Sequence, residues 1–460
     1  MANNYQIVRT IRFKNANEPG ILGKLTTAIG KTGTSIGEIK TVHMGNRYVV
    51  RDIDVFISGK PHMAKVLGEV SKIKEIKILE IRDAVLEMHQ NGIIKMVSTR
   101  PINSLDDFRK IYWPGVSEVC TLIGENENWK NAYTIIPNSV GLVTNGSAVL
   151  EFGDIGPVAA MPVLEGKAAL LQEVTGINGI PLLMKSGDPD IIVQTIREVE
   201  HTFSGIQLTG ISSPQCFNIL EKLKGDGKVP VMHDDQEGNA VVALAALINA
   251  CKLVDRDLDK ANIGVIGLGT TGTAIGKLLI EYTGNPVMGY TRTKASMERH
   301  VSNGGAIASI EQIMRMADIV IATTSKGNII RPEMVKKGQI ILALSQPVPE
   351  IDPDKAIEAG ASLAINSRAI NNSLSCPGIW RGTLDAHSQV INLEMYKAAA
   401  LAIADTTTEG EILPTSLDPH VHLAVTRAVA AAAVRSGVAR RRLDGDYFEA
   451  KDIKKPPRSL

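Results

Sequence analysis

Residues 231–240 read VMHDDQEGNA and gather side chains that could carry acid–base or metal chemistry. The imidazole of His233 stands next to two carboxylates, Asp234 and Asp235. A third acid, Glu237, follows two positions later. Adjacent carboxylates can ligate a divalent cation, and a carboxylate beside a base can take part in proton transfer. A solvated turn has a similar composition, so the stretch alone leaves a metal site, an acid–base pair and a turn as alternatives.

A glycine-rich segment, NIGVIGLGTTGTAIGKLLIEY, indicates a dinucleotide-binding site. It joins an apolar strand expected at 262–267 to a helix, with G-x-G-x-x-G spacing at the junction. Residues without side chains let the backbone approach a pyrophosphate, which the free N–H groups of the helix N-terminus then bind. A purely structural tight turn is the alternative. The residues expected to contact the cofactor are Gly267, Gly269, Thr270, Thr271 and Gly272.

The next expected strand, NPVMGYTRT, ends without the acidic residue that would hydrogen-bond a ribose 2′-hydroxyl. Thr291 and Arg292 stand there instead. A carboxylate would repel a 2′-phosphate, whereas a guanidinium binds it through two hydrogen bonds. The pattern therefore favours NADP over NAD, with stacking of Arg292 on the adenine or its exposure to water as the alternatives.

The elements around these motifs predict an α/β fold. From about 133 to 235, the short apolar strands YTIIP, VGLVTNG, GIPLLMK, SGIQLTG and VPVMHDD alternate with helices, which implies a parallel sheet covered on both faces. From about residue 240, the long Ala-rich helix NAVVALAALINACKLV opens a second α/β unit. That unit contains the glycine-rich loop and is expected to be a doubly wound Rossmann domain.

The first 85 residues form a separate expected unit with the order βαββαβ, which is ferredoxin-like. With EPGILGKLTTAIGKTG as its most specific part, this unit resembles an ACT domain, a small module that often binds amino acids and regulates attached enzymes. The resemblance implies an amino acid or other small effector around Asn17 to Ile21, where the first strand meets the first helix. A module that only mediates dimer contacts is the alternative.

The bulk composition excludes several classes of partner. The chain of 460 residues has 50 Lys and Arg against 49 Asp and Glu, which leaves no overall field to attract nucleic acid or an anionic membrane. No stretch approaches the roughly 20 apolar residues that span a bilayer, and the N-terminus lacks a signal-peptide pattern. The four cysteines are widely spaced, which points to reduced thiols. We expect a cytoplasmic protein that acts on a small molecule.

Several segments, taken in order, are similar to the signature blocks of the small bacterial malic enzymes. They are IYWPGVSEVC, VGLVTNGSAVLEFGDIGPVAAMPVLEGKA, GIQLTGISSPQCFNIL, VPVMHDDQEGNAVV, LALSQPVPEIDP and INNSLSCPGIWRG. The resemblance covers nearly everything from about 95 to 440, and malic enzymes with an N-terminal ACT module are a known arrangement. It implies NAD(P)-dependent oxidation of malate or a related small 2-hydroxy acid, then metal-assisted decarboxylation and protonation of the enol to pyruvate.

The resemblance also implies a domain plan. We expect an ACT-like regulatory domain at 1–85, a malic-enzyme N-terminal catalytic domain at 95–238, an NAD(P)-binding Rossmann domain with C-terminal helices at 239–440, and a charged tail at 441–460. ACT modules and this fold family both favour symmetric assemblies, so a homodimer or a higher oligomer is expected by analogy.

Four residues outside the opening stretch match the family's catalytic and substrate-binding positions. Lys167, in PVLEGKA, matches the general base, a role that requires burial or a neighbouring cation to lower its pKa. Tyr112, in IYWPGV, matches the general acid that protonates the enolate carbon. Asn371 and Asn372 match paired amides that bind the substrate. Without the resemblance, these residues read as a surface lysine, a packed tyrosine and a loop.

The metal site departs from the family. The resemblance implies that Asp234 orients Lys167 and that Asp235 is one metal ligand. In the family, a Glu followed directly by an Asp, in another segment, supplies two more ligands. Here that pair is replaced by Thr209 and Gly210, in GIQLTG. Removing two of three carboxylates takes away most of the charge that offsets dehydration of Mg²⁺ or Mn²⁺. A divalent metal is therefore doubtful, with Asp235 as its only surviving ligand.

These departures leave three functions open. The first is a malic-enzyme-like oxidoreductase, and the second is a metal-independent NADP-dependent oxidoreductase of the same fold that acts on another hydroxy or amino acid derivative. The third is an ACT-linked sensor with a weakened catalytic domain. The loop before the paired asparagines is shorter than in the family, and its Arg368 is a candidate clamp for a substrate carboxylate.

Overall fold

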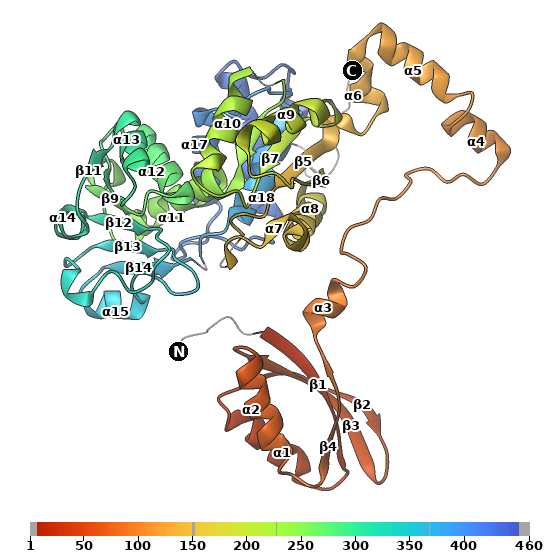
Figure 1. Ribbon diagram of the computed structural model, residues 1–460, viewed down its shortest axis with the longest axis vertical. Helices are drawn as coiled ribbons and strands as arrows, with labels where there is room; N and C mark the ends of the chain where they lie inside the picture. Colours follow the sequence, from red (N-terminus) through yellow and green to blue (C-terminus); the bar gives the residue numbers. More distant parts are fainter. Residues whose placement is uncertain (1–6, 150–151, 227, 368, 450–460) are drawn as a thin grey trace. The chain divides into compact units, whose positions relative to one another are not determined.

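The computed structural model describes residues 7–149, 152–226, 228–367 and 369–449 (Figure 1). The chain divides into two compact units, residues 1–95 and 96–460. Arg368, the candidate carboxylate clamp, lies outside the described residues. In the part that the structure describes, no helix is both long and apolar enough to cross a membrane.

The first unit is a four-stranded antiparallel sheet with two helices packed on it. Its elements are β1 (Ile7–Ala16), α1 (Ile21–Gly30), β2 (Ser35–Met44), β3 (Tyr48–Ile57), α2 (Lys60–Val70), β4 (Ile76–Arg82) and the short α3 (Ala84–Met88). The strand order is β2-β3-β1-β4. Ile11 and Phe13 on β1 pack against Leu25 of α1 and Val66 of α2. The predicted βαββαβ order of an ACT domain is confirmed.

The second unit begins with three short helices that bury none of their side chains. They are α4 (Leu105–Ile111), α5 (Val116–Glu125) and α6 (Lys130–Tyr133). Ser104 caps α4 by accepting a hydrogen bond from the Asp107 backbone N–H at 3.0 Å. The predicted strand YTIIP is wrong, because α6 and a 3₁₀ turn at Ile136–Asn138 occupy this segment. Pro137 has no N–H to donate to a sheet, and the Thr134 hydroxyl instead accepts from the Ile136 N–H at 3.2 Å.

The catalytic sheet of the second unit is four-stranded and parallel. Its strands are β5 (Ser139–Thr144), β6 (Asn178–Leu183), β7 (Gly205–Leu208) and β8 (Val231–His233), in the order β6-β5-β7-β8. Its helices are α7 (Gly156–Ala159), α8 (Met161–Thr175), α9 (Pro189–Val199) and α10 (Gln215–Asp226). Every residue of β5 is buried, as expected for a strand covered on both faces.

The dinucleotide sheet is six-stranded and parallel, with the order β11-β10-β9-β12-β13-β14. This is the doubly wound order of a Rossmann domain, which the sequence predicted. The strands are β9 (Ile263–Ile266), β10 (Met288–Tyr290), β11 (Ala306–Ile307), β12 (Ile319–Ala322), β13 (Ile340–Ala343) and β14 (Leu363–Asn366). The helices are α12 (Thr270–Thr283), α13 (Lys294–Ser302), α14 (Ile310–Met316) and α15 (Pro353–Glu358).

Five further helices complete the unit: α11 (Asn239–Leu253), α16 (Cys376–Asp385), α17 (Leu393–Asp405), α18 (Pro419–Arg435) and α19 (Gly445–Glu449). All residues from Ala240 to Cys251 of α11 are buried, so this helix forms a core between the two sheets. The chain then returns from the dinucleotide sheet to the catalytic sheet through α16. Trp380 of α16 packs on Gly205 of β7, where a Cβ atom would lie 2.3 Å from the indole ring.

Candidate active site

The stretch quoted first, VMHDDQEGNA, is not a solvated turn. β8 ends at His233, and a single π-helical turn, η5 (Asp234–Gly238), leads into α11. The side chains of His233 and Asp234 are fully buried. Isolated π-helical turns frequently lie at functional sites, because the extra residue reorients the side chains of the turn.

Asp234 forms the centre of a buried polar chain. Its Oδ2 lies 2.7 Å from the Nζ of Lys167, which α8 carries and whose side chain is 22% exposed. The same oxygen accepts a hydrogen bond from Nε2 of Gln207 at 2.9 Å, and Oε1 of Gln207 accepts one from the indole N–H of Trp380 at 2.6 Å. The structure thus brings Lys167 and Asp234 together, and Gln207, itself bound by Trp380, fixes the position of the carboxylate.

The electrostatics of Lys167 differ from the sequence expectation of a lowered pKa. Burial does lower the pKa of Lys167, but the nearby carboxylates of Asp234 and Asp235 raise it by more. The net result is a pKa well above the usual value of a lysine. The expectation failed because sequence could not show two carboxylates facing the amine. Lys167 is therefore an ammonium ion at neutral pH in this state of the protein.

Asp235 faces Gly210, which ends the GIQLTG segment where the resemblance implies a Glu-Asp pair. Its Oδ2 accepts a hydrogen bond from the backbone N–H of Gly210 at 2.8 Å. Burial and the charge of Asp234 together raise the pKa of Asp235 above its usual value. Thr209, which precedes Gly210 in the sequence, is buried and offers a neutral hydroxyl. One oxygen of Asp235 is thus already occupied by a backbone donor.

The glycine-rich loop lies against the same turn. Gly267 has a φ of 100°, a left-handed conformation that favours glycine, and a Cβ at Gly272 would lie 1.9 Å from the carbonyl oxygen of Gly267. No side chain caps the N-terminus of α12, which leaves its first N–H groups available for phosphate oxygens. The Thr271 hydroxyl donates to the backbone carbonyl of Asp235 at 3.0 Å. This bond connects the dinucleotide loop directly to η5.

Residues that follow the later strands complete the dinucleotide-binding edge. Glu350, fully buried, accepts hydrogen bonds from the backbone N–H groups of Thr324 at 2.6 Å and Ser345 at 3.0 Å. It therefore ties together the loops after β12 and β13. Thr291 and Arg292 follow β10, and Arg292 is exposed and forms no ion pair with a carboxylate in the described part of the chain.

Of the three remaining predicted residues that the structure describes, Asn371, Asn372 and Tyr112, only Asn372 lies beside η5. Asn372 packs beside η5, since a Cβ added to Gly238 would lie 3.1 Å from the Cβ of Asn372. Asn371 is exposed and caps the following 3₁₀ turn by accepting from the Ser373 N–H at 3.0 Å. Tyr112, at the end of α4, is 64% exposed and contacts Phe108 in a tilted ring pair with centroids 5.5 Å apart. The structure does not bring Tyr112 to Lys167.

Comparison with known proteins places this arrangement in a family. The NAD-dependent malic enzyme 1 of Bacillus subtilis is 45% identical over 430 residues, which cover 93% of this chain and 98% of the relative. The chain belongs to the malic enzyme family. An NAD-dependent malic enzyme of Geobacillus stearothermophilus is 36% identical over 94% of this chain and 95% of its own length. NADP-dependent malic enzymes, such as that of Haemophilus influenzae, are also similar, and the chain spans about half of that longer relative, 54%.

Domain profiles and solved structures agree with the family. The N-terminal domain of malic enzyme matches residues 91–188, the ACT domain matches 3–79, and the NAD binding domain of 6-phosphogluconate dehydrogenase matches 262–363. The crystal structure of malic enzyme from Pyrococcus horikoshii has a TM-score of 0.74 at 32% identity, covering 79% of this chain and 93% of that chain. An NAD-dependent malic enzyme from Thermotoga maritima has a TM-score of 0.71 at 33% identity, covering 76% and 99%.

Three neighbouring residues could hold the divalent metal ion that is expected for this family. One ligand atom each from His233, Asp234 and Asp235 lies within 4.8 Å of the others. Oδ2 of Asp234 contacts Lys167 and Gln207, whereas its Oδ1 and both ring nitrogens of His233 are buried without a hydrogen-bond partner among the described residues. The groups present therefore fit a divalent cation, although Thr209 and Gly210 offer no carboxylate where the resemblance implies two.

Two residues of the polar chain, Gln207 and Trp380, were missed by sequence reasoning. Gln207 stands in the middle of the apolar strand GIQL, where a buried amide must find hydrogen-bond partners. That was the available signal. Trp380 is separated from Gln207 by 173 positions, so no local pattern could pair them.

Proposed function

We propose that this malic enzyme oxidises malate with NAD(P) and decarboxylates the product to pyruvate. The observation that carries the proposal is the pair of Lys167, on α8, with Asp234, on the turn η5 that Thr271 links to the dinucleotide loop. The test is formation of NAD(P)H from malate, with pyruvate and CO₂ measured in the same reaction. Equal amounts of the three products support the proposal, and absence of NAD(P)H with every dinucleotide and metal tried contradicts it.

Lys167 must lose its proton before it can act as a base. The ammonium at 2.7 Å from Asp234 transfers that proton to the carboxylate or to solvent, and the free amine then accepts the malate 2-hydroxyl proton. Bound NAD(P)⁺ supplies the acceptor for the hydride from C2. Breaking the bond to the C4 carboxylate leaves an enolate, whose oxygen the Lys167 ammonium can hydrogen-bond. The proton taken from the hydroxyl equals the one delivered to C3, so pyruvate, CO₂ and NAD(P)H balance malate and NAD(P)⁺.

Tyr112 is proposed to donate the proton to C3 from a second copy of the chain. Helices α4, α5 and α6 bury no side chain, although they and their flanks expose large apolar residues: Phe108, Ile111, Tyr112, Trp113, Trp129 and Tyr133. An exposed apolar surface of this kind is typical of an interface. We call α4, α5 and α6 together the arm. We therefore propose a symmetric homodimer in which the arm of each copy carries Tyr112 to the Lys167 site of the other copy.

Mixing two inactive variants tests this arrangement. Tyr112→Phe and Lys167→Ala chains, unfolded together and refolded, form mixed dimers in which one site regains both groups if Tyr112 acts across the interface. About a quarter of the wild-type rate is then expected, since about half of the dimers are mixed and each has one complete site. If Tyr112 acts within its own chain, mixed dimers stay inactive, which would contradict the proposal.

The cofactor preference is proposed to include NADP as well as NAD. Arg292 is exposed after β10, and no acidic residue stands at the end of that strand to repel a 2′-phosphate. The names of similar proteins support both cofactors, since relatives are called NAD-dependent and NADP-dependent. For the metal, we propose weak binding of Mg²⁺ or Mn²⁺ at Asp235, because the backbone N–H of Gly210 faces it and neither Gly210 nor Thr209 offers a carboxylate.

A second candidate function is hydride transfer from a 2-hydroxy acid without loss of CO₂. The same replaced pair favours it, because a weakly held cation gives less stabilisation to the enolate that decarboxylation leaves. The ratio of CO₂ to NAD(P)H formed separates the two candidates. At the ACT unit, we propose that a small effector such as an amino acid binds around Asn17, whose Nδ2 donates to the Gly45 carbonyl at 2.9 Å.

A further inference from the structure

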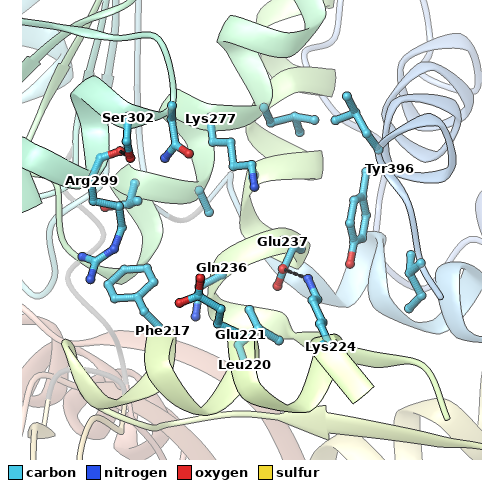
Figure 2. Close-up of a pocket in the computed structure, with 18 residues that line it drawn as sticks. Phe217, Leu220, Glu221, Lys224, Gln236, Glu237, Lys277, Arg299, Ser302 and Tyr396 are labelled. Carbon is cyan, nitrogen blue, oxygen red and sulfur yellow. Dashed lines mark hydrogen bonds and ion pairs between the residues drawn. The ribbon is translucent and has the colours of Figure 1, made fainter. Parts of the chain in front are cut away.

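A cavity of about 580 Å³ lies against the turn η5 but does not include the Lys167 site. Its walls come from α10, η5, α12, α13 and the segment that enters α17 (Figure 2). Gln236 and Glu237 of η5 line it, whereas Lys167, Asp234 and Asp235 do not. A volume of roughly 300–1,000 Å³ is typical of sites for small organic ligands. The cavity is therefore large enough for one such molecule.

The lining offers apolar and aromatic surface to the body of a ligand. Phe217 and Leu220 contribute it from α10, and Leu278 contributes it from α12. The guanidinium of Arg299 lies over the Phe217 ring, 4.0 Å from its centroid (Figure 2). The contact holds the arginine at the wall while leaving its N–H groups for another partner.

The charge of the lining favours an anion. Three cationic side chains, from Lys224, Lys277 and Arg299, face two carboxylates, from Glu221 and Glu237. Lys224 is neutralised by Glu237, with Nζ 2.6 Å from Oε1. For Lys277 and Arg299, the described residues provide no ion-pair partner. An acidic group is the complement of these two cations.

Two buried polar groups in the wall also lack a partner among the described residues. Nε2 of Gln236 and the hydroxyl of Tyr396 make no hydrogen bond, although the two residues are only 4% and 7% exposed. In Figure 2 the Tyr396 hydroxyl points into the cavity, on the side of Lys224. Buried polar groups are rarely left unpaired, because without a partner the loss of their hydrogen bonds to water is not compensated. A ligand in the cavity would supply their partner.

We propose that this cavity is a second small-molecule site, which takes an organic anion with an apolar body and one acidic group. The acidic group pairs with Lys277 and Arg299, the body packs on Phe217 and its apolar neighbours, and Gln236 and Tyr396 hydrogen-bond polar atoms of the ligand. A carboxylate, a phosphate or a sulfonate shares the required chemistry.

The turn η5 connects this site to catalysis. Glu237 accepts a hydrogen bond from the backbone N–H of His233 at 2.9 Å, and Asp234 and Asp235 lie in the same five-residue turn. A ligand that contacts Gln236 and Glu237 therefore acts on the backbone that positions the partner of Lys167. The site is thus regulatory. This role rests on the proposed function, whereas binding of an anion in the cavity is independent of it.

The test uses 1-anilinonaphthalene-8-sulfonate as the probe, an anion with an apolar body whose fluorescence rises on binding. The full chain is titrated with saturating NADP present, so that the dinucleotide site is filled. Lys277→Glu is expected to raise the Kd of the probe about tenfold, and Ala274→Trp, which fills the cavity from α12, to abolish that binding. Lys337→Glu, an exposed lysine outside the cavity, is the matched control and should change nothing.

Each outcome decides one part of the proposal. Probe affinity that is the same in wild type, Lys277→Glu and Ala274→Trp would overturn the site. Loss of binding in Ala274→Trp alone would overturn its preference for anions. The KM for malate, measured with and without the probe, tests regulation: a change in wild type that Ala274→Trp removes supports it, and an unchanged KM overturns it. NADP affinity and circular dichroism of both variants must match wild type for these comparisons.

Discussion

Replacing Asp234 with Asn should move the pH dependence of malate oxidation to lower pH. The substitution keeps the shape of the side chain and removes the charge 2.7 Å from Nζ of Lys167. Because oxidation needs the free amine, kcat/KM rises as pH passes through the pKa of Lys167. That pKa is raised in the wild type, so kcat/KM should keep rising through the neutral range and beyond. In Asp234→Asn the burial that lowers the pKa of Lys167 is opposed mainly by Asp235, with a smaller contribution from Cys376.

The magnitude follows from the geometry of the pair. Two unit charges 4 Å apart interact by about 4 kcal/mol at an effective dielectric constant of about 20. The shorter Nζ–Oδ2 distance strengthens the interaction, and the 22% exposure of Lys167 weakens it. Breaking a buried pair costs about 3 kcal/mol at the lower end, and each pH unit corresponds to about 1.4 kcal/mol. The rising limb should therefore shift down by roughly two pH units.

The assay is the initial rate of NAD(P)H formation at subsaturating malate from pH 6 to 10. Asp257→Asn is the matched control, since Asp257 is also ion-paired with a lysine, Lys260 at 2.8 Å, but lies on the surface of the dinucleotide domain. Its profile should coincide with that of the wild type. An Asp234→Asn profile that stays in place or moves to higher pH would refute the assignment of the rising limb to Lys167.

Three further predictions concern the cofactor, the metal and stability. Arg292→Ala should raise the KM for NADP about tenfold or more and leave that for NAD within about twofold; equal effects on the two cofactors would remove the 2′-phosphate argument. EDTA should reduce malate turnover. In the double variant Thr209→Glu/Gly210→Asp, which adds two carboxylates, the Mn²⁺ concentration that restores half of the rate should fall at least about tenfold. Unchanged or weaker metal affinity in this variant would contradict the weak-site proposal. Trp380→Phe should lower the free energy of unfolding by about 1–3 kcal/mol in urea denaturation, because Oε1 of Gln207 loses its buried donor, and an unchanged midpoint would show that the bond contributes little.

Much of the fold follows from local sequence patterns, because the two parallel sheets are built from apolar strands whose period differs from that of the helices between them. The glycine loop is equally local: Gly267 needs a left-handed φ, and the Cα of Gly272 lies against the backbone of the loop. The strand predicted for YTIIP was wrong for a reason that is also local. Its apolar residues suggested a strand, but Pro137 has no backbone N–H to donate to a sheet.

The electrostatics of the site could not be read in the same way. Lys167 and Asp234 meet only when α8 and the end of β8 are placed side by side, and the sign of the pKa shift depends on that distance. Gln207 and Trp380 meet because α16, which follows β14 of the dinucleotide sheet, returns to the catalytic sheet. The exposure of Tyr112 is likewise a property of the whole arm rather than of IYWPGV. Such facts depend on tertiary structure.

The most direct test of the account is the rate of NAD(P)H formation from malate by Lys167→Ala, with dinucleotide affinity measured on the same protein by fluorescence. The account predicts a fall in kcat of about 10²–10⁴-fold with dinucleotide affinity within about twofold of the wild type, because Lys167 moves protons and the loop at Gly267 binds the cofactor. Retention of the wild-type rate would contradict the account.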